Sequence, residues 1–181
     1  MKPSAAEVVR QAATKLRDAR FARICQYTAE ATGERRSVSR GQIDFVTGSA
    51  DMEMPTPGAE GSAAIVVLRP PRSYIRTPDG SWMLLVSVSR ESMDGTLECL
   101  ESEALVATER GEAGDGRAFD FRVEVEDAQL PRGTVWIDGD GYLTKLERPA
   151  RGERIAGVEF TAIGEPLALL SVPDAMAARR P

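Results

Sequence analysis

The first segment of the chain repeats its apolar residues at the period of an α-helix. The apolar positions are Val8, Ala12 and Leu16, and polar or charged side chains fall between them. Ser4 and Glu7 supply the S-x-x-E pattern of a capping box, in which each side chain accepts a backbone N–H group of the other residue. The spacing predicts an amphipathic helix over residues 4–19. Its apolar face either packs on a sheet or closes a cavity.

From Phe21 onward the apolar period is two, which is typical of half-buried β-strands. Ile43 and Phe45 alternate with the polar residues Gln42 and Asp44, and Met52 and Met54 alternate with Asp51 and Glu53. Turns are indicated by "PTPGAEG", "PPR" and "PDG", which are rich in Gly and Pro. The pattern predicts about ten to eleven short strands, and "LALLSVP" contains the last of them.

One internal stretch returns to helical spacing. Met93, Leu97 and Leu100 predict a short helix at residues 93–102. The polar tail at residues 174–181 is expected to fray.

These elements predict an α+β fold that is mostly β, in a single domain of residues 1–181. One antiparallel sheet with so many strands cannot stay flat, so it should curl. We expect the N-terminal helix and the mid-chain helix to cover the concave face of that sheet. The alternation leaves open which side of each strand faces inward.

The bulk composition narrows the classes of function. The chain has 181 residues, and 42% of them are hydrophobic, which is enough for a core. Its net charge of -5 argues against nucleic acid or an anionic membrane as a partner, because basic faces bind both. No window approaches the ~18 apolar residues that a membrane span needs.

The absence of histidine removes most familiar catalytic sites. Without imidazole there is no Ser-His-Asp or Cys-His nucleophile system and no His-ligated zinc. Cys25 and Cys99 lack the CxxC spacing of a zinc or redox motif, and whether they form a disulfide stays open. No Gly-rich loop joins a strand to a helix to hold a phosphate. The sequence therefore predicts no enzyme, no cofactor and no metal.

The segment "GTVWIDGDGYLTKLERP" holds two closely spaced aspartates, Asp138 and Asp140. It is not a helix-loop-helix calcium site, because the closing position of such a loop, which should be Glu, falls on Pro149. Two aspartates in one tight turn also cannot flank the cleft of a glycosidase. Asp and Gly tolerate the positive φ of hairpin turns, so the segment predicts a β-hairpin.

The start of the chain lacks the uninterrupted apolar stretch of a signal peptide. A cytoplasmic location is expected if Met1 is the native start, and the cell envelope if a leader was removed.

The order of these pieces resembles the LolA-like superfamily, and more narrowly the LppX/LprG-type lipoproteins of actinobacteria. Those proteins carry a "vWiD-x-x-G-x-l" hairpin, matched here by Val135, Trp136, Ile137, Asp138, Gly141 and Leu143. Their closing strand carries a pattern matched here by Phe160, Gly164, Pro166 and Pro173. The resemblance covers nearly the whole chain.

The resemblance implies a half-barrel, with a hydrophobic cavity for acyl chains between the curved sheet and its helices. It also implies a role in carrying lipids or lipoproteins across the cell envelope. Our first hypothesis is therefore a non-enzymatic carrier of a lipid, an acyl chain or another apolar ligand. The candidate ligand-binding residues are Val8, Ala12, Leu16, Phe45, Met52, Met54, Val67, Trp82, Leu97 and Leu100. The rival hypothesis is a structural or protein-interaction module of the same fold, with a filled core and no ligand.

Overall fold

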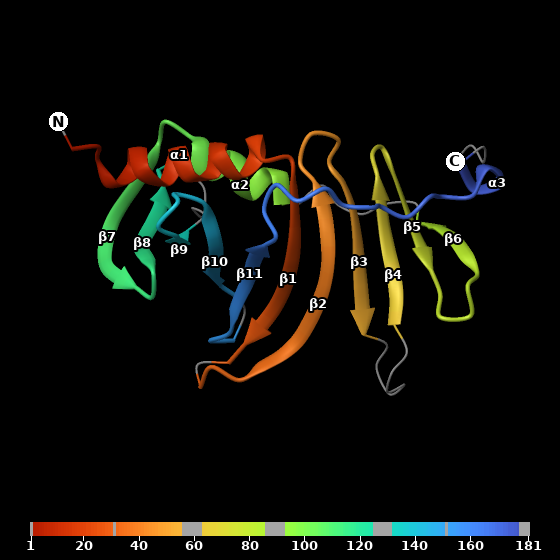
Figure 1. The fold of residues 1–181 in the computed structure, drawn as a ribbon. Coiled ribbons are helices and arrows are strands. Elements are labelled where there is room, and N and C mark those ends of the chain that lie inside the picture. Colours follow the sequence, from red (N-terminus) through yellow and green to blue (C-terminus); the bar gives the residue numbers. More distant parts are fainter. Residues whose placement is uncertain are drawn as a thin grey trace.

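The computed structural model describes residues 2–30, 32–55, 63–85, 93–124, 132–150 and 152–177. Its main feature is one curved, unclosed antiparallel sheet of eleven strands (Figure 1). The strands of one half are β1 (Phe21–Ala29), β2 (Arg35–Asp44), β3 (Ser49–Pro55), β4 (Ala63–Arg69), β5 (Arg72–Arg76) and β6 (Trp82–Leu85). Those of the other half are β7 (Leu105–Ala113), β8 (Gly116–Val123), β9 (Arg132–Ile137), β10 (Leu143–Pro149) and β11 (Ile155–Thr161). The described helices are α1 (Ala5–Asp18), α2 (Met93–Glu101) and α3 (Asp174–Ala177).

The strand order is β6-β5-β4-β3-β2-β1-β11-β10-β9-β8-β7. The chain starts in the middle of the sheet and builds outward to the β6 edge. It then passes through α2 to the opposite edge at β7, and hairpins bring it back to the middle. The first and last strands therefore pair with each other, with Ile24 opposite Phe160. The mostly β fold with a curved sheet, an N-terminal helix and a short mid-chain helix is as the sequence predicted.

Helix α1 begins at the capping box that the sequence indicated. The Ser4 N–H group donates to Glu7 Oε2 at 2.6 Å, and the Glu7 N–H group donates to Ser4 Oγ at 3.3 Å. The bond from the Ser4 backbone lowers the pKa of the Glu7 carboxyl. The helix buries Val9, Ala12, Ala13 and Leu16. Its buried stripe thus includes Val9 and Ala13, while Val8 is only half-buried.

The two faces of the sheet are easily told apart, because α1 packs on only one of them. We call that side the inner face and the other side the outer face. Helix α1 contacts β7, β8, β9 and β10, and α2 contacts α1 and β7. Their side chains join inner-face residues such as Phe119 and Val135 in the main core. Figure 1 shows both helices lying over the β7 half of the sheet.

After β11 the chain leaves the sheet and crosses the outer face of the other half, where Figure 1 shows it as a blue trace. We call residues 162–173 the C-terminal segment. The expected strand in "LALLSVP" is wrong, since these residues have no strand structure. The backbone of Leu170 bonds to side chains instead: its N–H group donates to Asp51 Oδ2, and Arg69 donates to its carbonyl oxygen, both at 2.6 Å.

A second core lies between the C-terminal segment and the outer face of the β6 half. Val67, Tyr74 and Met176 are its buried members. Met176 belongs to α3, a single helical turn within the stretch that was expected to fray. Residues 178–181 of that tail lie outside the described residues.

Candidate ligand-binding surface

The inner face of β3–β6 is apolar from one end to the other. In an antiparallel sheet, residues opposite each other share a face, so the register assigns the face of every residue. Met52 belongs to the main core and lies opposite Val66. We call the inner-face residues of these four strands the inner strip: Ala50, Met52, Met54, Ala64, Val66, Leu68, Ser73, Ile75, Met83 and Leu85. Only Ser73 is polar, and it is buried.

One row of the inner strip runs from the core to the open edge of the sheet. Met52 pairs with Val66, Val66 with Ile75, and Ile75 with Met83. Exposure increases along this row, from 7% for Met52 to 49% for Met83, with half-buried residues between them. Met54 in the neighbouring row is 43% exposed. The described part of the chain therefore leaves an apolar surface open to solvent at this edge.

Gly41 on β2 makes room for the buried end of that row. A Cβ atom built on Gly41 would lie 2.0 Å from the Asp51 carbonyl oxygen and 2.6 Å from Met52 Sδ. Any larger residue would push the methionine side chain away. Glycine at this position lets Met52 lie across β2, which joins the inner strip to the main core.

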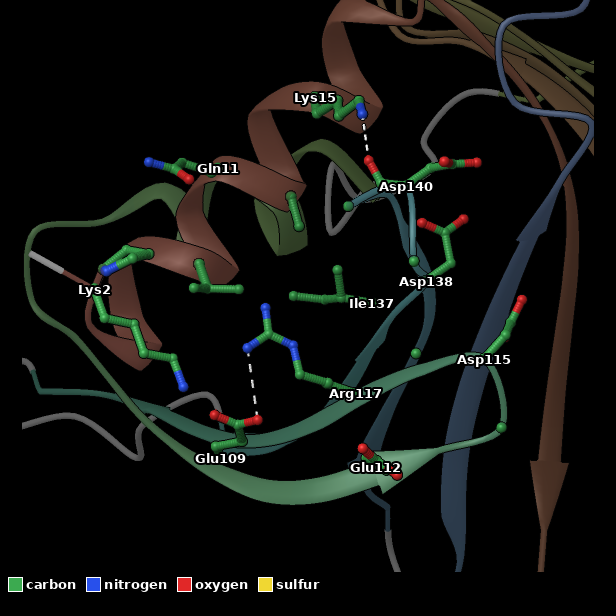
Figure 2. A pocket seen from close by; sticks show the side chains of 17 residues that line it. Lys2, Gln11, Lys15, Glu109, Glu112, Asp115, Arg117, Ile137, Asp138 and Asp140 are labelled. Atoms are coloured by element: carbon green, nitrogen blue, oxygen red, sulfur yellow. Dashed lines mark hydrogen bonds and ion pairs between the residues drawn. The ribbon is translucent and has the colours of Figure 1, made fainter.

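A polar pocket of about 770 Å³ lies at the other end of the sheet, between α1 and the turns of the β7–β8 and β9–β10 hairpins (Figure 2). Its apolar wall includes Val8, Ala12 and Ile137. The rest is mostly charged: Lys2, Lys15, Glu109, Glu112, Asp115, Arg117, Asp138 and Asp140. Lys15 donates to the Asp140 carbonyl oxygen, and Arg117 pairs with Glu109 at 3.6 Å. Much of the charge is thus used within the pocket wall.

The two aspartates of the pocket rim form a hairpin turn, as the sequence predicted. The Asp138 N–H group donates to the Tyr142 carbonyl oxygen at 3.0 Å, and Asp138 Oδ1 accepts the Tyr142 N–H group at 2.8 Å. Gly141 has a φ of 84°, a conformation that favours glycine. Among the described residues, no group of three or more Cys, Asp or Glu side chains could hold a metal ion. Asp138 therefore has a structural role here.

The structure divides the candidate ligand-binding residues into four groups. Leu16, Phe45, Met52, Leu97 and Leu100 are packed in the main core. Val8 and Ala12 also reach the wall of the polar pocket. Met54 lies on the exposed part of the inner strip. Val67 and Trp82 lie on the outer face with the second core, apart from the other eight.

Sequence reasoning missed Val66, Ile75, Met83 and Leu85, which form most of the open part of the inner strip. Val66 and Met83 are sequence neighbours of the proposed Val67 and Trp82, and the strand register places Ile75 and Leu85 on the same face as Val66 and Met83. The missing information was which side of each strand faces inward, and that depends on α1 and on the C-terminal segment.

The outer face of the β7 half is polar and closely bonded. Tyr27 donates to Glu147 Oε1 at 2.6 Å, and Lys145 Nζ lies 2.8 Å from the same oxygen. Burial, the Glu147 hydrogen bond and its charge together raise the pKa of Tyr27. Burial alone would raise the pKa of Glu147, but Lys145 and Tyr27 outweigh it and lower that pKa. The carboxylate therefore stays ionised, as expected of a solvated strand face.

The Tyr27 ring lies flat over Gly157 of the neighbouring strand. A Cβ atom on Gly157 would come within 2.2 Å of that ring. Glycine at this position therefore leaves room for the tyrosine ring, which reaches Glu147 from there.

Two solved structures are similar to this chain over most of its length. The lipoprotein LppX of Mycobacterium tuberculosis aligns with a TM-score of 0.67 and 16% identity, covering 93% of this chain and 100% of LppX. LprF of Mycobacterium bovis aligns with a TM-score of 0.61 and 7% identity, covering 94% of this chain and 97% of LprF. The chain thus has the LolA-like fold of these mycobacterial proteins. At such low identity, the likeness concerns the fold alone.

No family model matches the sequence, and no curated protein matches it. None of the described helices is both long and apolar enough to cross a membrane.

Proposed function

We propose that this protein is a non-enzymatic carrier that binds a lipid acyl chain, or a similar apolar ligand, on the inner strip. The observation that carries the proposal is the open apolar row from Met52 to Met83. The ligand would lie beside the helices, because Leu16, Leu97 and Leu100 already fill the space beneath them.

The two faces of the same strands support this proposal by contrast. The outer face of β3–β5 carries charged residues beside the second core, namely Asp51, Glu53, Arg69, Arg72 and Arg76. The inner face of these strands carries no charge, and the part of it near the open edge of the sheet is still exposed. Contiguous exposed apolar surface is uncommon on proteins that need no partner, and it often marks a binding site.

The chemistry of the inner strip suits an aliphatic chain. Burying each CH₂ group of a ligand is worth about 0.8 kcal/mol, so a long chain gains several kcal/mol along the row. Methionine side chains are flexible and polarisable, and they adapt to apolar ligands of varied shape. Met52, Met54 and Met83 supply three such side chains to one surface.

The likeness to LppX and LprF adds an architecture in which a curved sheet carries helices on one face. It supports the proposal only at that level. The rival hypothesis, a protein-interaction module, is favoured by the filled main core. In that case an apolar segment of a protein partner would cover the inner strip.

Native mass spectrometry and a fluorescent fatty acid test the proposal. The purified protein should carry a lipid that denaturation releases, or should take up the fatty acid. Met83→Asp should weaken uptake by about tenfold or more, because it places a charge where the acyl chain lies.

Val46→Asp is the matched control, since Val46 is 70% exposed in the turn between β2 and β3 and outside the inner strip. It should leave uptake unchanged. The proposal is wrong if the wild type carries no lipid and takes up no fatty acid, or if both variants weaken uptake equally. Capture of an apolar peptide without any lipid uptake would favour the rival.

A further inference from the structure

The inner strip continues into a polar part of the same face on β2 and β1. Ser39 Oγ on β2 donates to Met54 Sδ of the inner strip at 3.3 Å. Ser39 lies opposite Gln26 on β1, and Gln26 lies opposite Val158 of the main core, so Gln26 also belongs to the inner face. Gln26 is exposed, and Thr28, two residues further along β1, is half-buried on the same face. The apolar surface therefore ends in uncharged side chains that can form hydrogen bonds.

A cation follows this polar part on the inner face. Arg148 on β10 lies opposite Ala156 on β11, and Ala156 lies opposite Thr28. A Cβ atom on Gly133 would lie 3.1 Å from Arg148 Cγ, so the stem of the Arg148 side chain lies against the inner face. Thr28 and Arg148 are two strand spacings apart, roughly 10 Å, and the small side chain of Ala156 leaves space between them.

Arg148 is the unpaired charge of the inner face. The other charged residues on the inner face of the described strands are Glu109, Glu112 and Arg117, and all of these line the polar pocket near α1. The side chains of Arg148 and Gln26 form no ion pair or hydrogen bond within the described part of the chain, and both are exposed. Both are therefore available to a ligand.

This polar part lies away from the helices. Strand β1 follows α1 after a short connection, so its first residues lie beside the end of α1, whereas Gln26 and Thr28 lie toward its opposite end. Figure 1 shows β1, β2 and β11 extending well below both helices. A ligand can therefore lie along this end of the inner face, from Arg148 past Gln26 to Met54, without entering the filled core beneath the helices.

We propose that the ligand of the inner strip is an amphiphile with an anionic head, which Arg148 binds while the acyl tail lies on the strip. This inference rests on the proposed carrier function and names the class of its ligand. The guanidinium group is a rigid fork of N–H donors that matches carboxylate and phosphate oxygens, and the Gln26 amide would donate to the same head. A head above Ala156 lies three strand spacings from Met54, roughly 14 Å, so a long tail reaches the strip and continues along it.

Ligands with one chain and different heads test this site separately from the strip. Octadecanoate, octadecyl phosphate and octadecanol each compete with the fluorescent fatty acid for the full-length protein. The wild type should bind the two anions about tenfold more tightly than the neutral alcohol. That preference should shrink as salt increases. Tighter binding of octadecanoate indicates a carboxylate head, and tighter binding of octadecyl phosphate indicates a phosphate head.

The decisive variant is R148Q, which should weaken binding of both anions about tenfold and leave octadecanol within about twofold of the wild type. R132Q is the matched control, because Arg132 is exposed at the same end of the neighbouring strand β9 but on the outer face, opposite to its neighbour Gly133. It should leave all three ligands within about twofold. Met83→Asp acts on the tail and should weaken binding of all three alike.

The proposal is overturned if the wild type binds the three ligands equally, or if R148Q and R132Q reduce the preference for anions to the same extent. The carrier proposal stands in both of these cases, because the acyl chain is still bound. If none of the three ligands binds, the carrier proposal fails, and the anionic head fails with it. The two failures therefore give different results.

Discussion

The two ends of the sheet are covered on opposite faces. At the β7 end, α1 and α2 cover the inner face, and the outer face meets water with charged and hydrogen-bonded side chains such as Glu147 and Asp120. At the β6 end, the C-terminal segment covers the outer face through Leu170, and the inner face is left open. The open face at the first end is polar, whereas the open face at the second end is apolar.

That difference relates the polarity of each strand face to what covers it. A strand face is apolar where the chain itself buries it and polar where water meets it. Both faces of the β7 end follow this rule, and so does the outer face of the β6 end. The inner strip is the exception, and the apolar ligand that we propose would cover it.

The largest expected effect contrasts the packed end with the open end. Phe119 is completely buried under α1, so Phe119→Ala should lower the free energy of unfolding by about 3–5 kcal/mol. Met83→Ala should cost less than about 1 kcal/mol without ligand, because its side chain is half exposed. Urea titration followed by circular dichroism measures both. Equal losses would mean that the inner strip is part of the packed core.

The next effect concerns the attachment of the C-terminal segment. Arg69 Nη2 lies 2.7 Å from Asp51 Oδ1 and also donates to the Leu170 carbonyl oxygen. Arg69→Ala leaves Asp51 buried without its cation and should cost about 2–3 kcal/mol. Arg122→Ala breaks an exposed pair with Glu124 and should cost less than about 0.5 kcal/mol.

Limited proteolysis of the Arg69→Ala variant locates the loss. Cleavage should begin in the C-terminal segment while the β7 half stays protected. Simultaneous loss of both halves would show that the two ends unfold as one unit.

A smaller effect is expected at the β9–β10 hairpin of the packed end. Gly141→Ala places an alanine at positive φ and should cost about 1 kcal/mol in thermal or urea denaturation. Gly139→Ala in the same turn has no positive φ to oppose and should cost less. Fatty-acid uptake should be unaffected by either, because the turn lies at the far end from the inner strip.

The smallest expected effect concerns the dependence of stability on pH. Burial alone would raise the pKa of Asp44, but Arg20 and the backbone N–H groups of Val46 and Thr47 outweigh it and lower that pKa. The stabilisation is therefore present above the unfolded value of 3.8 and is lost as pH falls through the lower folded value. Asp44→Asn should flatten the acid limb of a stability-against-pH curve. An unchanged slope of stability against pH below pH 4 in this variant would contradict the prediction.

The sequence predicted the local elements well because their signals are local. The Ser4–Glu7 capping box and the four-residue apolar spacing lie within α1 itself, and the alternation of the strands lies within each strand. The hairpin at Asp138 also follows from residues inside the turn. None of these needs information from elsewhere in the chain.

The rest depended on contacts between distant parts of the chain. "LALLSVP" is as apolar as a strand, but Asp51 and Arg69 bind the Leu170 backbone and hold the segment across the sheet instead. That crossing buries Val67 on the outer face and leaves Ile75 on the inner one. Alternation fits either choice of face, so the strip could not be assigned from the pattern.

The pairing of β1 with β11 also has a consequence for how the chain folds. During synthesis β1 emerges long before its partner strand, because Ile24 and Phe160 lie far apart in the sequence. Until then β1 is an unpaired strand edge, able to pair with other chains. Contacts between such distant residues slow folding, because a long loop must close first. This strand order therefore predicts slow refolding, with aggregation that increases with protein concentration.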